Sequence, residues 1–314
     1  MRRLKVLTWH THGSYLYYLS QAPHDFFVLS QPGRPSGYGG RCGKLPWGGN
    51  VHDLPLAQLR GQAFDCILFQ DVQQWEKDQY AFLTPAQRSL PRIYLEHDLP
   101  RVHPTDTPHP VDDPNVLLVH VAPFNALMWD SRRTPTTVIE HGVLVPENVR
   151  YRGELERGLT ISHHLARRGR RMGADLFLRA RAELPLDLAG SAADEFGGIG
   201  ELQHAQLPAF SSHYRFLFSP IRYGSLSLAV IEAMMVGIPV VAFATAEMAT
   251  VIEDGANGYS DTRFERLAEC MRELLRSPSL ARDIGQAGRR RAQERFSIER
   301  FSADWDAALH RVTA

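Results

Sequence analysis

The sequence predicts two doubly wound α/β domains that face each other across a cleft. Short apolar runs suited to strands alternate with helical patterns on both sides of a polar linker at residues 144–157. At 314 residues, the chain is too long for one typical domain and suits two. We therefore expect an N-terminal domain over residues 1–146 and a C-terminal domain over residues 147–296.

The last helical pattern, at residues 297–314, needs an apolar partner outside itself. Phe301, Trp305 and Leu309 fall on one face of this predicted helix. In a chain with two domains, such a helix can return to the first domain and complete it.

In the N-terminal half, apolar runs bounded by turns predict strands, and longer segments between them predict helices. The predicted strands cover residues 4–9, 26–29, 64–70, 92–95, 116–120 and 138–143. The predicted helices cover residues 15–19, 72–83 and 124–130. Two long loops, residues 31–50 and 99–114, lack periodicity, and loops of this length are usually functional or mobile.

The C-terminal half repeats the alternation and then becomes helical. Strands are expected at residues 158–161, 186–189, 216–218 and 238–243. Helices are expected at residues 168–183, 202–207, from about 225 to 236, 263–276, 279–295 and 298–312. Because ligands bind beyond the carboxyl ends of parallel strands, the loops that follow these strands are the candidate site.

Composition and charge narrow the function classes. Hydrophobic residues make up 44% and charged residues 22%, as in ordinary globular proteins, and 35 basic residues balance 35 acidic ones. A net charge of zero gives no electrostatic reason to expect a nucleic-acid partner. The three cysteines have no paired or metal-type spacing, and no apolar stretch reaches spanning length. We expect a cytoplasmic protein that at most contacts the inner face of a membrane peripherally.

One segment carries the most specific pattern in the chain. Residues 219–241 read SPIRYGSLSLAVIEAMMVGIPVV: a turn, a helix and the start of a strand. The backbone N–H groups at the start of such a helix suit a diphosphate, because they lack partners and carry partial positive charge. This segment resembles the donor-site signature of retaining GT-B glycosyltransferases of the family-4 type.

The resemblance implies a GT-B fold and an activity. Enzymes of this family move a sugar from a nucleoside diphosphate sugar to an acceptor hydroxyl, with retention of anomeric configuration and without a metal or other cofactor. It implies that Glu232 binds the ribose hydroxyls of the donor. It also places the donor against the turn formed by Arg222, Tyr223, Gly224, Ser225, Leu226 and Ser227.

One position departs from the family pattern. The family has a first glutamate eight residues before the second, and this chain has Gly224 there. Three explanations remain open: Arg222 or Tyr223 replaces that glutamate, the transferred sugar differs, or catalysis is lost. If catalysis is lost, the chain is a non-catalytic GT-B-like protein that binds a nucleotide sugar or a glycan.

The resemblance extends to a basic turn after the first strand of the second domain. There it aligns Arg168 and His163 with two cations that hold the diphosphate in the family. Arg168 can bind phosphate bidentately, whereas His163 is a weaker and pH-dependent cation. A solvated helix start or a patch that meets anionic lipid is the alternative interpretation of these residues.

The N-terminal domain offers candidates on the acceptor side. His97 ends a predicted strand, where the resemblance implies a histidine that contacts the transferred sugar or orients the acceptor hydroxyl, so His97 and Arg168 are the candidate catalytic residues. His10, His12 and Gly13 form the loop after the first strand, which in the family faces the diphosphate and the acceptor. The acceptor class, whether glycan, lipid-linked or small molecule, stays open. No Gly-x-Gly-x-x-Gly motif follows that strand, which argues against a nicotinamide-dependent oxidoreductase.

Overall fold

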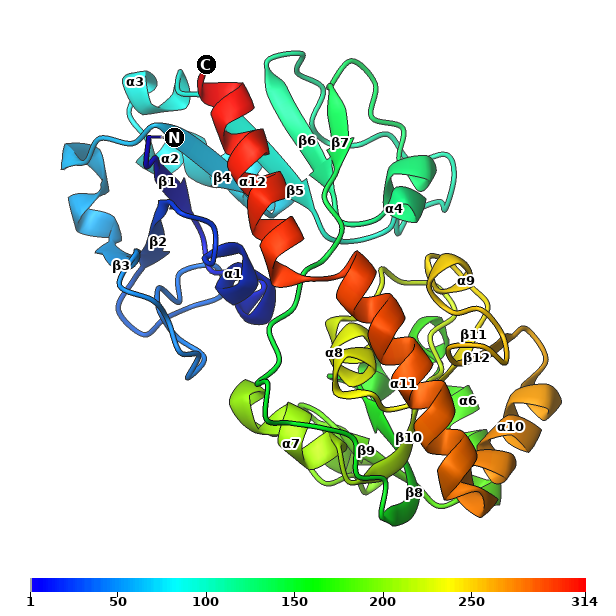
Figure 1. The fold of residues 1–314 in the computed structure, drawn as a ribbon. Helices are drawn as coiled ribbons and strands as arrows, with labels where there is room; N and C mark the ends of the chain where they lie inside the picture. Colours follow the sequence, from blue (N-terminus) through cyan, green and yellow to red (C-terminus); the bar gives the residue numbers. More distant parts are fainter. Residues whose placement is uncertain (1) are drawn as a thin grey trace. The chain divides into compact units, whose positions relative to one another are not determined.

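The computed structural model describes residues 2–314 and confirms the predicted fold class (Figure 1). The chain divides into two compact units. Unit 1 runs to Gly142 and includes Ile298–Ala314, and unit 2 is Val143–Ser297. The observed division after residue 142 lies four residues before the expected one after residue 146.

Unit 1 is built on a seven-stranded parallel sheet in the order β3-β2-β1-β4-β5-β6-β7. The strands are β1 Lys5–Thr8, β2 Asp25–Ser30, β3 Val51–Pro55, β4 Cys66–Phe69, β5 Arg92–Glu96, β6 Val116–His120 and β7 Thr136–Val138. The helices are α1 Gly13–Leu19, α2 Gln79–Phe82, α3 Pro85–Arg88, α4 Pro123–Met128 and α12 Ile298–Thr313, with a 3-10 turn η1 at Leu56–Gly61 and a π turn η2 at Gln74–Asp78.

The C-terminal helix α12 packs into unit 1. Phe301, Trp305 and Leu309 are fully buried, and the indole N–H of Trp305 donates to the hydroxyl of Tyr15 on α1 at 3.2 Å. The imidazole Nε2 of His310 lies 3.0 Å from the backbone carbonyl of Arg2. Helix α12 therefore contacts both α1 and the residues just before β1.

Unit 2 has a five-stranded parallel sheet in the order β12-β11-β10-β8-β9. The strands are β8 Leu155–Ile161, β9 Leu186–Ala189, β10 Tyr214–Ser219, β11 Val240–Phe243 and β12 Tyr259–Asp261. The helices are α5 Leu165–Arg168, α6 Ala174–Glu183, α7 Leu207–Ser211, α8 Leu228–Val236, α9 Met248–Val251, α10 Phe264–Arg276 and α11 Pro278–Arg295, with 3-10 turns η3 Gly169–Met172, η4 Ala193–Phe196 and η5 His204–Gln206.

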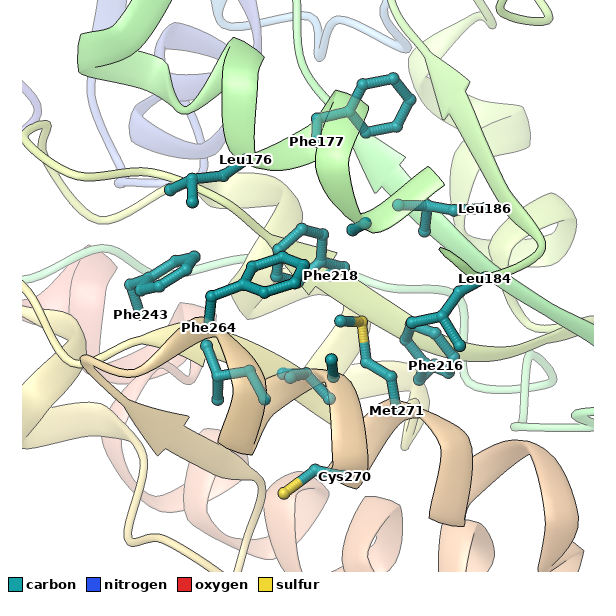
Figure 2. Packing of buried hydrophobic residues seen from close by; sticks show 14 of the residues in the cluster. Leu176, Phe177, Leu184, Leu186, Phe216, Phe218, Phe243, Phe264, Cys270 and Met271 are labelled. Carbon is teal, nitrogen blue, oxygen red and sulfur yellow. The ribbon is translucent and has the colours of Figure 1, made fainter. Parts of the chain in front are cut away.

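The core of unit 2 lies between the sheet and the helices α6 and α10. Figure 2 shows Phe216 and Phe218 of β10 among side chains from these two helices, including Phe177 and Met271. Phe216 and Phe218 are two residues apart on a strand, so both point to this face of the sheet. Helix α8 contacts β10 and β11 and also packs against α11. Burial on both faces of the sheet explains why its strands read as short continuous apolar runs.

Several sequence predictions were wrong in detail. Strand β3 was missed because His52 and Asp53 make Val51–Pro55 polar, which an edge strand tolerates. Strand β12, of only three residues, was also missed. The strand expected at residues 138–143 is β7 at Thr136–Val138 instead, where it pairs with β6.

The helix predicted at residues 168–183 is broken. Residues 165–172 form two short turns, α5 and η3, and the regular helix α6 begins only after Gly173. Gly173 adopts a left-handed φ of +81°, and a Cβ placed there would lie 1.9 Å from the carbonyl oxygen of Pro220. The break therefore lets the backbone before α6 approach the loop that follows β10.

This close approach makes a stability prediction. Gly173→Ala is expected to lower the free energy of unfolding by about 3 kcal/mol, since it adds steric overlap to backbone strain. Gly255→Ala is the matched control, because its φ is +75° and no atom lies within 4 Å of the added Cβ. That control should lose about 1 kcal/mol. Equal losses in urea denaturation of the two variants would contradict the close packing at Gly173.

Candidate functional site

The candidate site in unit 2 lies where the strand order reverses. The chain passes from β8 outward to β9 and then returns to the other side of β8 as β10, so the loops after β8 and β10 diverge. Ligands of open α/β sheets bind at such a switch point, beyond the carboxyl ends of the strands. A narrow hollow there is lined by residues that include Ser162 after β8, Ser219 at the end of β10, and Pro220 and Ser227 after β10.

A second hollow lies beside the first, between the loop 219–227 and the end of β11. Gly224, Ser225, Leu226 and Ser227 line it, together with residues that follow β11, among them Glu247. These four residues were all predicted to face the donor, and they form one continuous loop beside the switch point. Their role toward a ligand remains a prediction.

Helix α8 begins between these two hollows. Ser227 is its N-cap, in an extended conformation, and the serine hydroxyl makes no capping hydrogen bond. The helix begins at Leu228, three residues later than the predicted start near Ser225. Ser227 and Ala229 both line the hollow at the switch point. Because the first N–H groups of a helix have no partner within the helix and carry partial positive charge, this end of α8 suits an anion.

Glu232 lies on the second turn of α8 and is buried. Its carboxylate oxygen lies 3.9 Å from Nδ1 of His204, which comes from the 3-10 turn η5. Burial lowers the pKa of His204. His204 was not predicted as a site residue, since it lies 28 residues before Glu232 in a loop without a motif. The only sequence signal for His204 as a site residue was the presence of a histidine in the loop after β9.

The loop after β10 is held by several contacts with neighbouring elements. The backbone N–H groups of Arg222 and Tyr223 both donate to the carbonyl of Arg171, at 3.0 and 3.1 Å. The hydroxyl of Thr245 donates to the carbonyl of Ile221 at 3.0 Å. Together with the close approach at Gly173, these bonds fix the backbone that carries the candidate donor residues.

The side chain of Arg222 is engaged within the protein. Its guanidinium donates to both carboxylate oxygens of Asp175 on α6, one of them at 2.8 Å, and to the carbonyl of Arg170 at 2.8 Å. The hydrogen bond from Arg222 is the main reason that the pKa of Asp175 is lowered. In this arrangement Arg222 ties the loop to α6, which favours Tyr223 over Arg222 as a replacement for the absent glutamate.

Gly224 is not required by the backbone. It has no left-handed φ, and a Cβ placed there would lie 3.3 Å from the Cγ2 of Ile221 and 3.5 Å from the Sδ of Met172. Only the contact with Ile221 is closer than ordinary van der Waals contact, and both contacts are with side chains rather than backbone. The absence of a carboxylate at this position is therefore not explained by the fold.

His163 and Arg168 lie in the segment that follows β8. The Nδ1 atom of His163 accepts a hydrogen bond from the backbone N–H of Ser191 at 3.0 Å, so the neutral ring carries its proton on Nε2. The pKa of His163 is lowered, mainly by partial desolvation of the ring, although the residue is exposed. His163 is thus uncharged at neutral pH, and it can offer a donated hydrogen bond where a full cation was expected. Arg168 is the last residue of α5 and is partly exposed.

In unit 1, the predicted site residues come from two places. His10, His12 and Gly13 follow β1, and His97 follows β5. The rings of His12 and His97 lie against each other, with centroids 4.2 Å apart. His10 instead turns toward the loop 31–50, where its Nδ1 lies 2.7 Å from the carbonyl of Gly40. The side chains of His10 and His12 therefore have different neighbours, and the role of this loop toward a ligand stays a prediction.

The protonation of His97 follows from its neighbours. The amide nitrogen of Gln70 donates to the hydroxyl of Thr8 and the carbonyl of Trp9, so the amide oxygen faces Nε2 of His97 at 3.1 Å. Nε2 therefore carries the proton. Burial, followed by the nearby His12 and His141, holds the pKa of His97 well below its ordinary value. A neutral His97 can accept a proton or a hydrogen bond at Nδ1.

A third hollow, of about 310 Å³, lies in unit 1 at the carboxyl ends of β1 and β4. These strands flank the switch point of the unit 1 sheet, since β2 and β3 lie on one side of β1 and β4 on the other. Polar side chains dominate the lining, which consists of Thr11, Ser36, Gly37, Tyr38, Asp71, Gln73, Gln74 and Asp78. No lysine or arginine lines this hollow among residues 2–314.

The structure as a whole has the fold of GT-B glycosyltransferases. Sucrose-phosphate synthase from Thermosynechococcus elongatus superposes with a TM-score of 0.69 at 15% identity, over 99% of each chain. HepE from Anabaena, solved in complex with UDP, gives a TM-score of 0.69 at 14% identity over 99% of this chain and 100% of that one. TarM gives 0.61 at 16% identity over 81% of this chain and 57% of that one.

A family model matches most of unit 2 and the first residues of α12. Residues 167–306 match the family model described as glycosyl transferase-like. This segment contains Arg168, the whole loop after β10, and Glu232. A comparison with curated protein sequences finds no match. Within residues 2–314, no helix combines the length and the apolar character needed to cross a membrane.

The neutral state of His163 leads to a prediction about pH. The lowered pKa keeps the imidazole of His163 uncharged above pH 6.5. Between pH 6.5 and 8, His163 therefore adds no pH-dependent attraction for phosphate. We expect nucleotide-sugar affinity, measured by calorimetric titration, to change less than twofold over this range. His163→Gln should show the same flat profile. A tenfold increase toward pH 6.5 that disappears in His163→Gln would show that His163 acts as a cation.

Proposed function

We propose that this chain transfers a sugar from a nucleoside diphosphate sugar to an acceptor hydroxyl. The observation that carries the proposal is the convergence of three features at one edge of the unit 2 sheet. The start of α8 and the serine-rich loop 224–227 line the two hollows, and the buried Glu232 follows on the second turn of the same helix. This edge falls inside the segment that matches the glycosyl transferase-like family model.

Each feature has a role toward the donor in this proposal. The N-terminal amides of α8 and the guanidinium of Arg168 stabilise the charge that develops on the departing diphosphate. Glu232 accepts hydrogen bonds from the ribose hydroxyls, and the side chains of Ser225 and Ser227 bind the phosphates. The donor sugar lies near Tyr223 and Gly224. UDP-sugars are the first donors to test, since HepE was solved with UDP-glucose and TarM with UDP.

The chemistry proposed is electrostatic and needs no metal or other cofactor. The leaving phosphate takes the proton of the acceptor hydroxyl on the face of the sugar that it has just left, so the anomeric configuration is retained. In unit 1, neutral His97 orients the acceptor through Nδ1, and His10, His12 and Gly13 form the adjoining loop. His97 and Arg168 are the proposed catalytic residues.

The acceptor class follows from the polar hollow in unit 1. A site lined by Asp71, Asp78 and uncharged polar side chains suits a glycan or another polyhydroxyl compound, because carboxylates and amides accept and donate hydrogen bonds to hydroxyl groups. The same lining disfavours an acceptor whose bound end is anionic. We propose a cytoplasmic setting, where nucleotide sugars would be available, with peripheral membrane contact if the acceptor is lipid-linked.

A second function is favoured by one observation. Gly224 stands where the resembling family keeps a carboxylate, so the chain could bind a nucleotide sugar or glycan without turnover. Release of free nucleoside diphosphate, measured by a coupled assay over pairs of donors and acceptors, separates the two proposals. Acceptor-dependent release would establish transfer, and tight donor binding without any release would favour the binding protein.

Removal of the Glu232 carboxylate tests the donor site directly. Glu232→Ala is expected to weaken nucleotide binding at least tenfold, because charge-assisted hydrogen bonds to the ribose are lost. Glu253→Ala is the control, since Glu253 is an exposed glutamate of the same unit. Calorimetric titration of both folded variants measures the effect. Unchanged nucleotide affinity in Glu232→Ala would remove this residue from the site.

A further inference from the structure

The polar hollow of unit 1 contains a buried carboxylate with one oxygen left open. Asp78, on the π turn η2, lines this hollow of about 310 Å³, although the residue is only 7% exposed. Its Oδ2 accepts a hydrogen bond from the hydroxyl of Tyr38 at 2.6 Å. Within residues 2–314, no group donates to Oδ1, and this oxygen is not fully enclosed. Asp78 therefore offers a ligand in the hollow one carboxylate oxygen.

No cation of the protein balances the charge of Asp78. In the part of the chain that the structure describes, Asp78 forms no ion pair. Lys77, its neighbour in the chain, is exposed and is not among the residues that line the hollow. Tyr38 stays neutral, because burial and then its hydrogen bond to Asp78 raise its pKa. A buried charge without a partner is costly, so a ligand that brings a positive charge is stabilised here.

A second carboxylate adds to the negative potential of the hollow. Asp71 lines the hollow and is exposed, and its Oδ1 accepts a hydrogen bond from the backbone N–H of Gln73 at 2.8 Å. Burial raises the pKa of Tyr94 on the neighbouring strand β5, and nearby carboxylates, Asp71 and Glu76 among them, raise it further. This end of the unit 1 sheet is therefore an attractive place for a cation.

An organic cation fits the hollow better than a metal ion. A divalent metal takes several protein ligands around one point. Within residues 2–314, the one cluster of three suitable ligand atoms consists of His24, Asp306 and His310, and none of these residues lines the hollow. An ammonium group instead needs one carboxylate and a few neutral acceptors for its three N–H donors. The hollow supplies this set of groups.

The other groups of the hollow suit hydroxyls and connect it to His97. Thr11 and Ser36 line the hollow with hydroxyl groups. The amide nitrogen of Gln74 donates to the Oγ1 of Thr11 at 2.8 Å, which leaves the hydroxyl proton of Thr11 for a ligand. The amide oxygen of Gln74 accepts from the backbone N–H of Gln70 at 2.8 Å, and the side chain of Gln70 faces His97. One hydrogen-bond network therefore runs from the hollow to the proposed catalytic histidine.

We propose that the hollow of unit 1 binds a polyhydroxyl amine, such as an amino sugar, through its ammonium group. The Oδ1 of Asp78 accepts a charge-assisted hydrogen bond from the ammonium, and Asp71 adds attraction from the exposed side. The hydroxyls of Thr11 and Ser36 bind hydroxyl groups of the same ligand. That this ligand is the sugar acceptor rests on the proposed function, whereas the binding of an ammonium group does not. The protonated amine is the anchor, and a hydroxyl of the ligand is the group that reacts.

The test measures the binding of matched pairs of sugars to the full chain, without any nucleotide sugar. The probes are glucosamine, galactosamine and the fully deacetylated disaccharide of chitin, each compared with its N-acetylated form, which carries no positive charge. Titration by NMR at about pH 6.5, below the pKa of such amines, gives the dissociation constants. We expect an amine to bind about tenfold more tightly than its N-acetylated form, because acetylation removes the charged hydrogen bond to Asp78.

Three variants identify the carboxylate that binds the amine. Asp78→Asn keeps an oxygen that accepts from Tyr38, and it should reduce the preference for the amine to less than about twofold. Asp71→Asn should reduce the preference by about threefold, since Asp71 is exposed and acts through solvent. Glu76→Gln is the matched control, because Glu76 is an exposed carboxylate of the same turn that does not line the hollow. This control should leave the preference unchanged.

Four results would overturn the proposal. They are an absence of binding by all three amines, equal affinity for each amine and its N-acetylated form, an unaltered preference in Asp78→Asn, and displacement of the amine by equimolar calcium chloride. The last result would assign the hollow to a metal ion. Because no transfer is measured, a failure of this test leaves the proposed glycosyl transfer standing, and a failure to detect transfer leaves the ammonium site standing.

Discussion

The candidate donor site depends on one topological constraint, the return of the chain from β9 across β8 to form β10. Parallel strands must be joined by crossovers, and the reversal of direction at β8 makes the loops after β8 and β10 leave the sheet on opposite sides. Every proposed donor contact in unit 2 comes from the segments that begin there: His163 and Arg168 from the first, and residues 222–232 from the second. The sheet order, rather than any single side chain, brings these segments together.

Glycine and ion pairing then give the loop after β10 a defined conformation. Gly173 lets the backbone before α6 contact the carbonyl of Pro220, and Asp175, two residues later, pairs with Arg222. Gly173 and Asp175 both lie at the start of α6, so this helix supports the loop that precedes α8. A preorganised loop loses less conformational entropy on binding an anion, and the amides at the start of α8 are aimed before the ligand arrives. The same contacts hold the guanidinium of Arg222 against Asp175 and the carbonyl of Arg170.

The sequence predicted the fold well where burial leaves a strong pattern. Strands β6 and β9 were predicted to the residue because both are apolar runs buried in the sheet. The sequence-based prediction failed where strand pairing stabilises a segment with a weak apolar pattern. Strand β3 is such a segment, because an edge strand tolerates its polar residues His52 and Asp53. It also failed at α6, since the role of Gly173 depends on Pro220, 47 residues away. His204 and Glu232 are brought together only by the fold, so no local spacing could indicate this pair.

The central claim is that a nucleoside diphosphate sugar binds at the switch point of the unit 2 sheet. Hydrogen–deuterium exchange, with and without a saturating nucleotide sugar, tests it most directly because it reports on individual backbone amides. The account predicts slower exchange in residues 162–168 and 219–232, with the largest change at the amides that begin α8. Protection that falls instead on residues 249–257, or on unit 1 alone, would contradict it.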